Sequence, residues 1–246
     1  VIHDALEANY PIGILTEKYI NDNEVSILSD INSSFKKLVS EQAVKEGKNY
    51  LSLKIAEKLT LDFLKLERRL IRNLNKNNQQ LNIIAKEVEL SHNLFVDGVD
   101  FRLIGKADRV DLISDTLRII DYKTGKVEQN ELSFLEFDEL IDNTKKSKAF
   151  QLLMYTYLYL KMNPKHIGFN VLAGNFTFKN LEPGLLKVSK RINTREVKEI
   201  QINEFVLSEF ESQLEIVLTK INNDDFIQTE DANNCEWCDY RSICKR

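Results

Sequence analysis

The 246-residue sequence lacks the features that mark several large classes of protein. No apolar run approaches the roughly 18 residues that a membrane-spanning helix needs, so we expect no membrane span. No secretory signal peptide is visible, and there are no internal repeats or low-complexity tracts. With 43% hydrophobic and 29% charged residues mixed along the chain, the composition is that of an ordinary folded protein with a substantial core.

The chain also lacks an excess of basic residues. It has 34 lysines and arginines against 38 aspartates and glutamates, which gives a net charge of −4. This balance lowers the expectation of a nucleic-acid-binding protein, because a basic surface is the usual electrostatic footprint of one. It does not exclude a metal-dependent nuclease, which concentrates acidic residues in its site and needs only a local basic groove.

Cysteine is scarce, and its placement indicates metal ligands rather than disulfides. The three cysteines, Cys235, Cys238 and Cys244, lie within ten residues of one another. An odd number at such close spacing is a poor disulfide framework, and it favours an intracellular, cytoplasmic protein. Three thiolates are one ligand short of a closed zinc or iron–sulfur site.

The hydrophobic pattern predicts helices first, then a sheet, then further helices. Apolar residues at three- and four-residue spacing predict helices over 24–46 and 50–74, and a short helix is expected over 3–10. The later elements expected are strands over 81–90, 101–113, 116–122 and 166–173, a tight turn at Asp97-Gly98, a loop with one helical turn over 127–148, a hairpin over 176–200 around Pro183-Gly184, and helices over 149–162 and 203–222. This order is that of an α/β protein with helical additions.

One stretch of the sequence carries chemistry. Asp108 lies in one predicted strand, and Asp121 and Lys123 lie in the next. Residues two apart in a strand point to the same face, so Asp121 and Lys123 project together, and Asp108 can reach them from the neighbouring strand. Two carboxylates and an ammonium at one point suit a divalent metal and a water made into a nucleophile, the chemistry of phosphodiester hydrolysis. The alternative from spacing alone is a salt bridge at a strand end.

Four motifs in order resemble one nuclease family. The segments 105–111 (GKADRVD) and 121–125 (DYKTG) resemble the paired motifs of the RecB/AddB nuclease domain, within the PD-(D/E)XK nuclease superfamily. Segment 2–7 (IHDALE) resembles the I-H-x-x-L-E segment of that family, and 151–155 (QLLMY) resembles its Q-x-x-x-Y helix. The resemblance implies a restriction-endonuclease-like core, with a mixed central sheet flanked by helices and an N-terminal helical portion.

The resemblance also implies a set of metal ligands. In the family pattern Asp108, Asp121 and His3 hold Mg²⁺ or Mn²⁺, and the backbone carbonyl of Tyr122 is a further ligand. Glu87, on the strand before the central hairpin, matches a frequent acidic position of the family. Oxygen-rich ligation suits Mg²⁺ or Mn²⁺.

Other residues receive catalytic or binding roles from the same resemblance. Lys123 is expected to position or activate the attacking water, while Gln151 and Tyr155 line the site and touch the scissile strand. The alternative for Gln151 and Tyr155 is packing within an apolar helix. Basic residues near the motifs are candidates for a groove along the phosphate backbone, or for an ordinary solvated face: Lys106, Arg109, Lys126, Lys145, Lys146 and Lys148.

The cysteine spacing resembles the C-terminal part of the iron–sulfur staple in AddB-type nucleases, whose fourth cysteine lies upstream of the histidine motif. We therefore expect Cys235, Cys238 and Cys244 to be an incomplete iron–sulfur site here, with a [4Fe–4S] cluster in the full-length protein only. A vestigial site and an adventitious metal site are the alternatives.

These observations predict a single nuclease domain over 1–246, and we expect it to be a piece of a longer protein. It comprises a helical portion (1–80), an α/β catalytic core (81–202) and a C-terminal helix with a cysteine-containing tail (203–246). The expected function is a metal-dependent deoxyribonuclease, an exonuclease of DNA recombination and repair, with DNA and a helicase–nuclease subunit as partners. A non-catalytic DNA-binding or assembly module and a hydrolase of small phosphoesters are the alternatives. No phosphate-binding G-x-x-x-x-G-K-[ST] motif is present, so we expect no ATPase activity.

Overall fold

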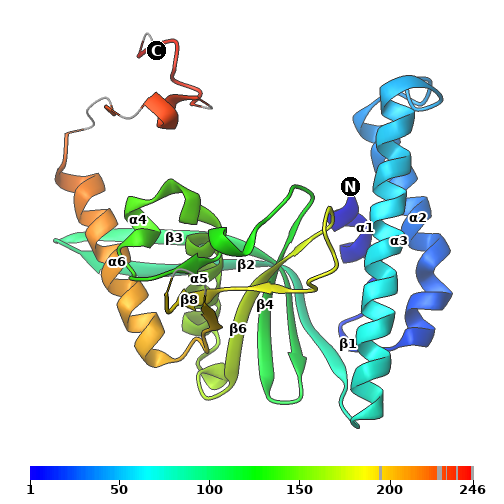
Figure 1. Cartoon of the computed structure of the whole chain (residues 1–246), viewed down its shortest axis with the longest axis horizontal. Helices are drawn as coiled ribbons and strands as arrows, with labels where there is room; N and C mark the ends of the chain where they lie inside the picture. The colour runs from blue at the N-terminus through cyan, green and yellow to red at the C-terminus, as the bar shows by residue number, and fades with distance from the viewer. Residues whose placement is uncertain (194–195, 226–228, 231, 237, 245–246) are drawn as a thin grey trace.

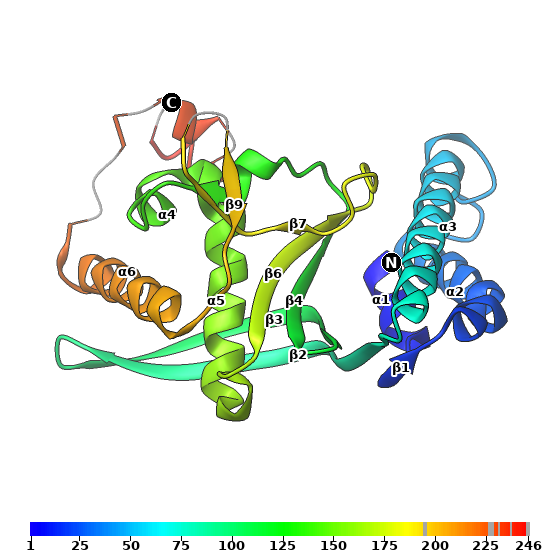
Figure 2. The same ribbon diagram turned by 60° about the horizontal axis from the view of Figure 1, so that its bottom comes forward.

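The computed structural model describes residues 1–193, 196–225, 229–230, 232–236 and 238–244. Its N-terminal helices, α1 (Ile2–Asn9), α2 (Glu17–Leu38) and α3 (Gly47–Lys76), pack together beside one end of a mixed β-sheet (Figure 1). The later helices α5 (Ser147–Met162) and α6 (Glu204–Asn223) lie on the other side of the molecule, and α5 runs across the sheet (Figure 2). The predicted α/β fold, with a mixed central sheet flanked by helices, is therefore confirmed.

The central sheet has the strand order β1-β2-β3-β4-β6-β7. Its strands are β1 (Gly13–Leu15), β2 (Leu81–Val96), β3 (Val99–Ile113), β4 (Thr116–Lys123), β6 (Asn170–Thr177) and β7 (Leu186–Lys187). Neighbouring strands pair antiparallel except β4 and β6, which are parallel. A parallel pair needs a long crossover, and here the crossover carries α5 onto the face of the sheet.

The segment 127–148, predicted as a loop with one helical turn, contains that turn and further short ordered pieces. It contains η1 (Gln129–Glu131), β5 (Ser133–Phe134), α4 (Glu139–Asp142) and η2 (Thr144–Lys146), and η3 (Pro164–His166) follows α5. Strand β5 joins β8 (Ser189–Arg191) and β9 (Val197–Glu199) in a second small sheet, which the sequence analysis did not predict. Such pieces are too short to show a period of 2 or 3.6, so tertiary pairing decides them.

Among the other boundaries that differ from prediction, two have clear local reasons. Helix α2 begins at Glu17, well before the predicted start at 24, because the Thr16 side chain caps it by accepting a hydrogen bond from the Tyr19 N–H at 3.1 Å. Strand β2 continues beyond the predicted end at 90 to the turn at Asp97 and Gly98. Both turn residues have positive φ, 49° and 81°, as a tight two-residue hairpin requires. None of the helices in the described part of the chain has the length and apolarity of a membrane span.

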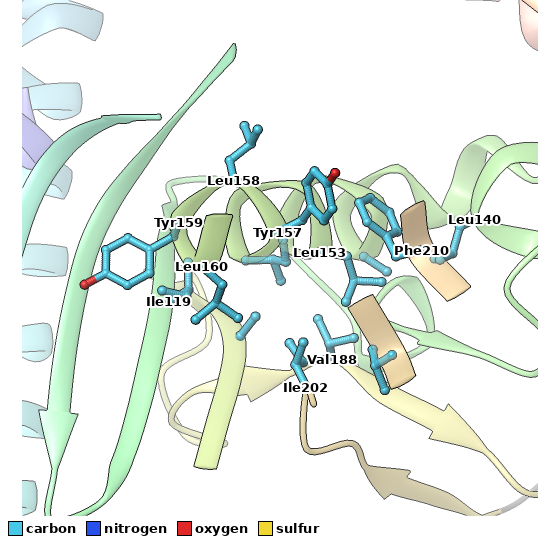
Figure 3. Close-up of a cluster of buried hydrophobic side chains, with 14 of the residues drawn as sticks. Ile119, Leu140, Leu153, Tyr157, Leu158, Tyr159, Leu160, Val188, Ile202 and Phe210 are labelled. Carbon is cyan, nitrogen blue, oxygen red and sulfur yellow. The ribbon is translucent and has the colours of Figure 1, made fainter. Parts of the chain in front are cut away.

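Strand β4 is buried on both faces, as its unbroken apolar run predicts. Leu117 and Ile119 belong to the hydrophobic cluster under α5 and α6, part of which Figure 3 shows. Ile120 and Tyr122 belong to a second cluster, formed with α1, α2 and α3. Helices α5 and α6 thus pack on one face of β4, the strand that carries Asp121 and Lys123, and α1, α2 and α3 pack on the other.

A buried network of charges ties α3 to this strand pair. Arg109 on β3 donates to Asp111 Oδ2 at 2.7 Å and to Glu67 Oε2 of α3 at 2.9 Å. Arg118 on β4 donates to Asp111 Oδ1 at 2.6 Å and to Asp111 Oδ2 at 2.8 Å. Arg109, Asp111 and Glu67 are at most 1% exposed. The placement of Arg109 in a nucleic-acid groove was therefore wrong, because its guanidinium neutralises buried carboxylates.

Removal of Asp111 tests this network. Burial favours a higher pKa for Asp111, but the charges of Arg118 and Arg109 outweigh it and hold the pKa below its usual value. Since Asp111→Ala leaves two arginines without their shared carboxylate, we expect the free energy of unfolding in urea to fall by about 3–5 kcal/mol. The control is Asp62→Ala, which removes an exposed partner of Lys58 and Lys65 and costs at most about 1 kcal/mol. Equal losses in the two variants would contradict the prediction.

Candidate active site

Strands β3 and β4 bring the predicted trio together. Lys123 Nζ lies 2.9 Å from Asp121 Oδ2, which matches the expectation that these side chains share one face. Asp108 Oδ2 accepts a hydrogen bond from the backbone N–H of Tyr122 at 2.5 Å, so the Asp108 carboxylate lies across the end of β4. Asp121 is buried, while Lys123 and Asp108 are partly exposed. The site is therefore closed to solvent at Asp121 and open to solvent at Asp108 and Lys123.

Asn175 is a site residue that the sequence analysis missed. It is the parallel-strand partner of Asp121, and its Nδ2 donates to Asp121 Oδ2 at 2.8 Å and to the Asp121 carbonyl at 3.1 Å. The signal was an asparagine inside the apolar strand β6, since a fully buried polar side chain needs a specific partner. Asn175 and Lys123 together fix the orientation of the Asp121 carboxylate.

Helix α1 brings His3 to the same place. His3 Nδ1 lies 3.7 Å from Asp108 Oδ2, and the imidazole stands edge-on to the Tyr122 ring at a centroid distance of 5.6 Å. His3, Glu87 and Asp108 each offer a ligand atom within 4.8 Å of the others. Among the described residues, this is the group of histidine, cysteine or acidic side chains whose spacing suits a metal ion. Glu87 thus lies beside His3 and Asp108, whereas Asp121 falls outside this group.

The backbone at Glu87 is strained. Glu87 lies on β2 between Lys86 and Val88, and its φ of 45° is in the left-handed region. Its carboxylate lies close to that of Asp108, so the two charges repel, and a non-glycine residue with positive φ costs further free energy. Lys106 offsets part of this cost, because its Nζ lies 2.6 Å from Glu87 Oε2. Strain of this kind is typical of functional sites.

Burial and mutual repulsion disfavour the ionised forms of the carboxylates in this site. Burial, together with the charges of Asp121 and Glu87, raises the pKa of Asp108 to about 7, against the lowering effect of the Tyr122 N–H. Burial likewise raises the pKa of Asp121, and it lowers the pKa of His3. A cation placed here would favour the ionised carboxylates and the neutral imidazole, which are the forms that bind metal.

The residues present fit a divalent metal ion. His3 supplies an imidazole nitrogen, Glu87 and Asp108 supply carboxylate oxygens, and all three are partly exposed, so solvent can complete a coordination shell. Carboxylate oxygens completed by water suit Mg²⁺ or Mn²⁺. The predicted roles of Asp121 and of the Tyr122 carbonyl as ligands remain predictions. In the structure the Oδ2 of Asp121 is engaged by Lys123 and Asn175.

Helix α5 joins the site through Gln151. Lys123 Nζ donates to Gln151 Oε1 at 2.8 Å, and Gln151 Nε2 donates to the Tyr155 hydroxyl at 2.8 Å. Burial and the charge of Asp121 raise the pKa of the Tyr155 hydroxyl. The Tyr155 ring packs on Gly105, where a Cβ would lie 3.0 Å from two ring carbons. Gln151 thus hydrogen-bonds to both Lys123 and Tyr155, and Tyr155 also packs against the sheet at Gly105.

The predicted basic groove is largely absent around these residues. Lys146 is buried, and its Nζ donates to the backbone carbonyls of Asn130 and Ser133, both at 2.6 Å, so its assignment to a groove was wrong. Lys106, Lys126 and Lys148 are each paired with a glutamate, which reduces their positive field. Lys145 is exposed.

An apolar hollow of about 520 Å³ adjoins the site. Its lining residues include His3, Thr124 and Lys179, together with Phe35, Ile55 and Leu59 from the N-terminal helices. Because His3 lines the hollow and also belongs to the candidate metal group, the hollow adjoins the candidate site.

The cysteines do not assemble a metal site within the described residues. Cys235 is buried, Cys238 is exposed and Cys244 is intermediate, and none of them forms a disulfide. Their thiols are not among the groups of three potential ligand atoms found in the described part of the chain. The iron–sulfur role therefore stays a prediction about the full-length protein.

A family comparison agrees with this geometry. The chain belongs to the PD-(D/E)XK nuclease superfamily, whose model matches residues 1–245. No curated protein matches the chain. Among solved structures, one described as "Crystal structure of SSO0001" has 13% sequence identity over 88% of this chain and 83% of that chain, with a TM-score of 0.29. A likeness of this size supports no inference.

Substitution of Gly105 tests the packing behind Tyr155. In Gly105→Ala the new Cβ meets the Tyr155 ring, so we expect the free energy of unfolding to fall by about 1–3 kcal/mol in urea denaturation. In the background Tyr155→Ala the same change should cost less, since only the contact of the new Cβ with Leu158 Cδ1, at 3.2 Å, remains. The control is Gly168→Ala, where a Cβ meets no atom within 4 Å. Undiminished stability of Gly105→Ala would disprove the close contact.

Proposed function

We propose that the protein is a Mg²⁺- or Mn²⁺-dependent deoxyribonuclease that hydrolyses phosphodiester bonds. The observation that carries this proposal is the convergence of Asp108, Asp121 and Lys123 at the point where His3 and Glu87 also meet. Membership of a nuclease superfamily supports the same reaction class. We propose His3, Asp108, Asp121 and the Tyr122 carbonyl as metal ligands, with Glu87 as a further carboxylate.

The chemistry that a divalent cation supplies in such a site is polarisation of the phosphate and a lowered pKa for the attacking water. The residues of the chain then have separate tasks. Asp108, oriented by the Tyr122 N–H, and Asp121, oriented by Asn175, present carboxylate oxygens at fixed positions. Preorganised charges of this kind cost little reorganisation during the reaction.

Lys123 is proposed to orient the water and to neutralise the charge that develops on the phosphate. Its ammonium is held between Asp121 Oδ2 at 2.9 Å and Gln151 Oε1 at 2.8 Å, so its direction is restricted. Gln151 and Tyr155 complete this side of the site and are proposed to touch the scissile strand. The hollow beside His3 and Thr124 provides room for the rest of the nucleotide chain.

The biological role that we propose is exonucleolytic processing of DNA ends in recombination and repair, in the cytoplasm, with a helicase–nuclease subunit as partner. The motif order from 2–7 to 151–155 supports the RecB/AddB type. A non-catalytic DNA-binding or assembly module and a hydrolase of small phosphoesters are the competing functions. The experiment below separates the three.

Digestion of end-labelled DNA tests the proposal. We expect wild-type protein to degrade single- or double-stranded DNA with Mg²⁺ or Mn²⁺ and not with EDTA. Asp121→Ala and Lys123→Met should each lower the cleavage rate by about 10²–10⁴-fold, because each removes a group that acts on the reacting water or phosphate. DNA binding, measured by filter retention, should be largely kept.

The control for this experiment is Asp62→Ala on the exposed face of α3, which should cleave DNA at the wild-type rate. Circular dichroism and a thermal melt establish that each variant is folded. Binding without cleavage by the wild-type protein would favour the assembly module, and neither binding nor cleavage would favour the small-substrate hydrolase. Cleavage retained by folded Asp121→Ala would refute the assigned residues.

A further inference from the structure

The candidate metal group is assembled across an interface between a helix and a sheet. His3 comes from the eight-residue helix α1, whereas Glu87 and Asp108 come from β2 and β3. The imidazole can face the carboxylates only if α1 is held at a fixed position against these strands. A contact that fixes α1 on the sheet therefore decides whether the ligand atoms meet.

Lys86 makes this contact. Its Nζ donates to the Tyr10 carbonyl at 2.5 Å and also to the Glu7 carbonyl. Helix α1 ends at Asn9, so both acceptors belong to the end of the helix, where carbonyl groups lack partners within the helix. A lysine ammonium at this end also interacts favourably with the helix dipole.

Lys86 is paired with Arg109 on β3 and lies next to Glu87, whose backbone is strained. Successive residues of a regular strand point to opposite faces, so Lys86 and Glu87 should diverge. The positive φ of Glu87 breaks this alternation, and Lys86 and Glu87 both line one small cavity together with His3 and Asp108. Strand β2 thus presents the Glu87 carboxylate to His3 and Asp108 and the Lys86 ammonium to the end of α1.

We propose that Lys86 is a positioning residue that fixes the end of α1 on β2 and thereby holds the His3 imidazole beside Asp108 and Glu87. The inference rests on the metal-binding role proposed above for His3. Lys86 itself uses its ammonium for backbone carbonyls, so it acts on the metal centre through α1.

A double-mutant cycle on Mn²⁺ affinity tests this role on the full chain, with free Mn²⁺ measured by electron paramagnetic resonance. Lys86→Met keeps most of the side-chain stem and removes the donors, and we expect Mn²⁺ binding to weaken about 10-fold, as for other residues that orient a metal ligand. Lys86→Arg, which keeps the charge and donors, should restore most of the affinity. In the His3→Ala background, Lys86→Met should have no further effect, because the ligand that it positions is absent.

The matched control is Lys146→Met. Lys146 also donates to two backbone carbonyls, but in the segment before α5, so its loss should leave Mn²⁺ affinity at the wild-type level. Thermal melts establish folding, and Lys86→Gln replaces Lys86→Met if the latter does not fold. Wild-type affinity in Lys86→Met, an equal loss in Lys146→Met, or an undiminished effect without His3 would each overturn the inference. Wild-type protein that binds no Mn²⁺ would refute the metal centre itself, and this inference with it.

Discussion

The buried pairing of Arg109 and Arg118 with Asp111 and Glu67 is the interaction on which the rest of the structure depends. It joins α3 to the strands β3 and β4 with two positive and two negative charges, all removed from water. Such a network is stable only when it is complete, because one missing partner leaves a buried charge uncompensated. Arg109 also donates to the Tyr122 hydroxyl at 3.2 Å, and the Tyr122 N–H holds Asp108. Tyr122 thus links the buried charge network to the candidate site.

The candidate site lowers the stability of the folded state. Glu87, Asp108 and Asp121 bring carboxylates together in a partly buried place, and Glu87 adopts a left-handed backbone conformation. Repulsion between the carboxylates and their desolvation both destabilise the folded state, and the ion pairs of Lys106 and Lys123 offset only part of this destabilisation. The surrounding helices and the charge network must supply the stability that holds these groups in place. A divalent cation relieves the same repulsion, so metal binding and stability are coupled.

The residues of the segment 105–111 have different physical roles, although they stand together in the sequence. Gly105 leaves room for the Tyr155 ring, Asp108 faces the candidate metal group, and Arg109 and Asp111 are structural. A motif therefore does not mark every member as catalytic. Arg109 and Lys146 are candidates for a basic groove or a solvated face in the sequence, but both are buried in the structure, where they donate to Glu67 and to the Asn130 carbonyl.

Local sequence determined the types of the long helices and strands, the tight turn at Asp97-Gly98 and the shared face of Asp121 and Lys123, because strand period and turn chemistry depend on neighbouring residues. The sequence also suffices for membership of the superfamily, whose model matches residues 1–245. Only the tertiary structure decided that Glu87 joins His3 and Asp108, and that Asn175 orients Asp121. These contacts join residues up to about a hundred positions apart, and no local period or propensity encodes which distant partner a side chain will meet.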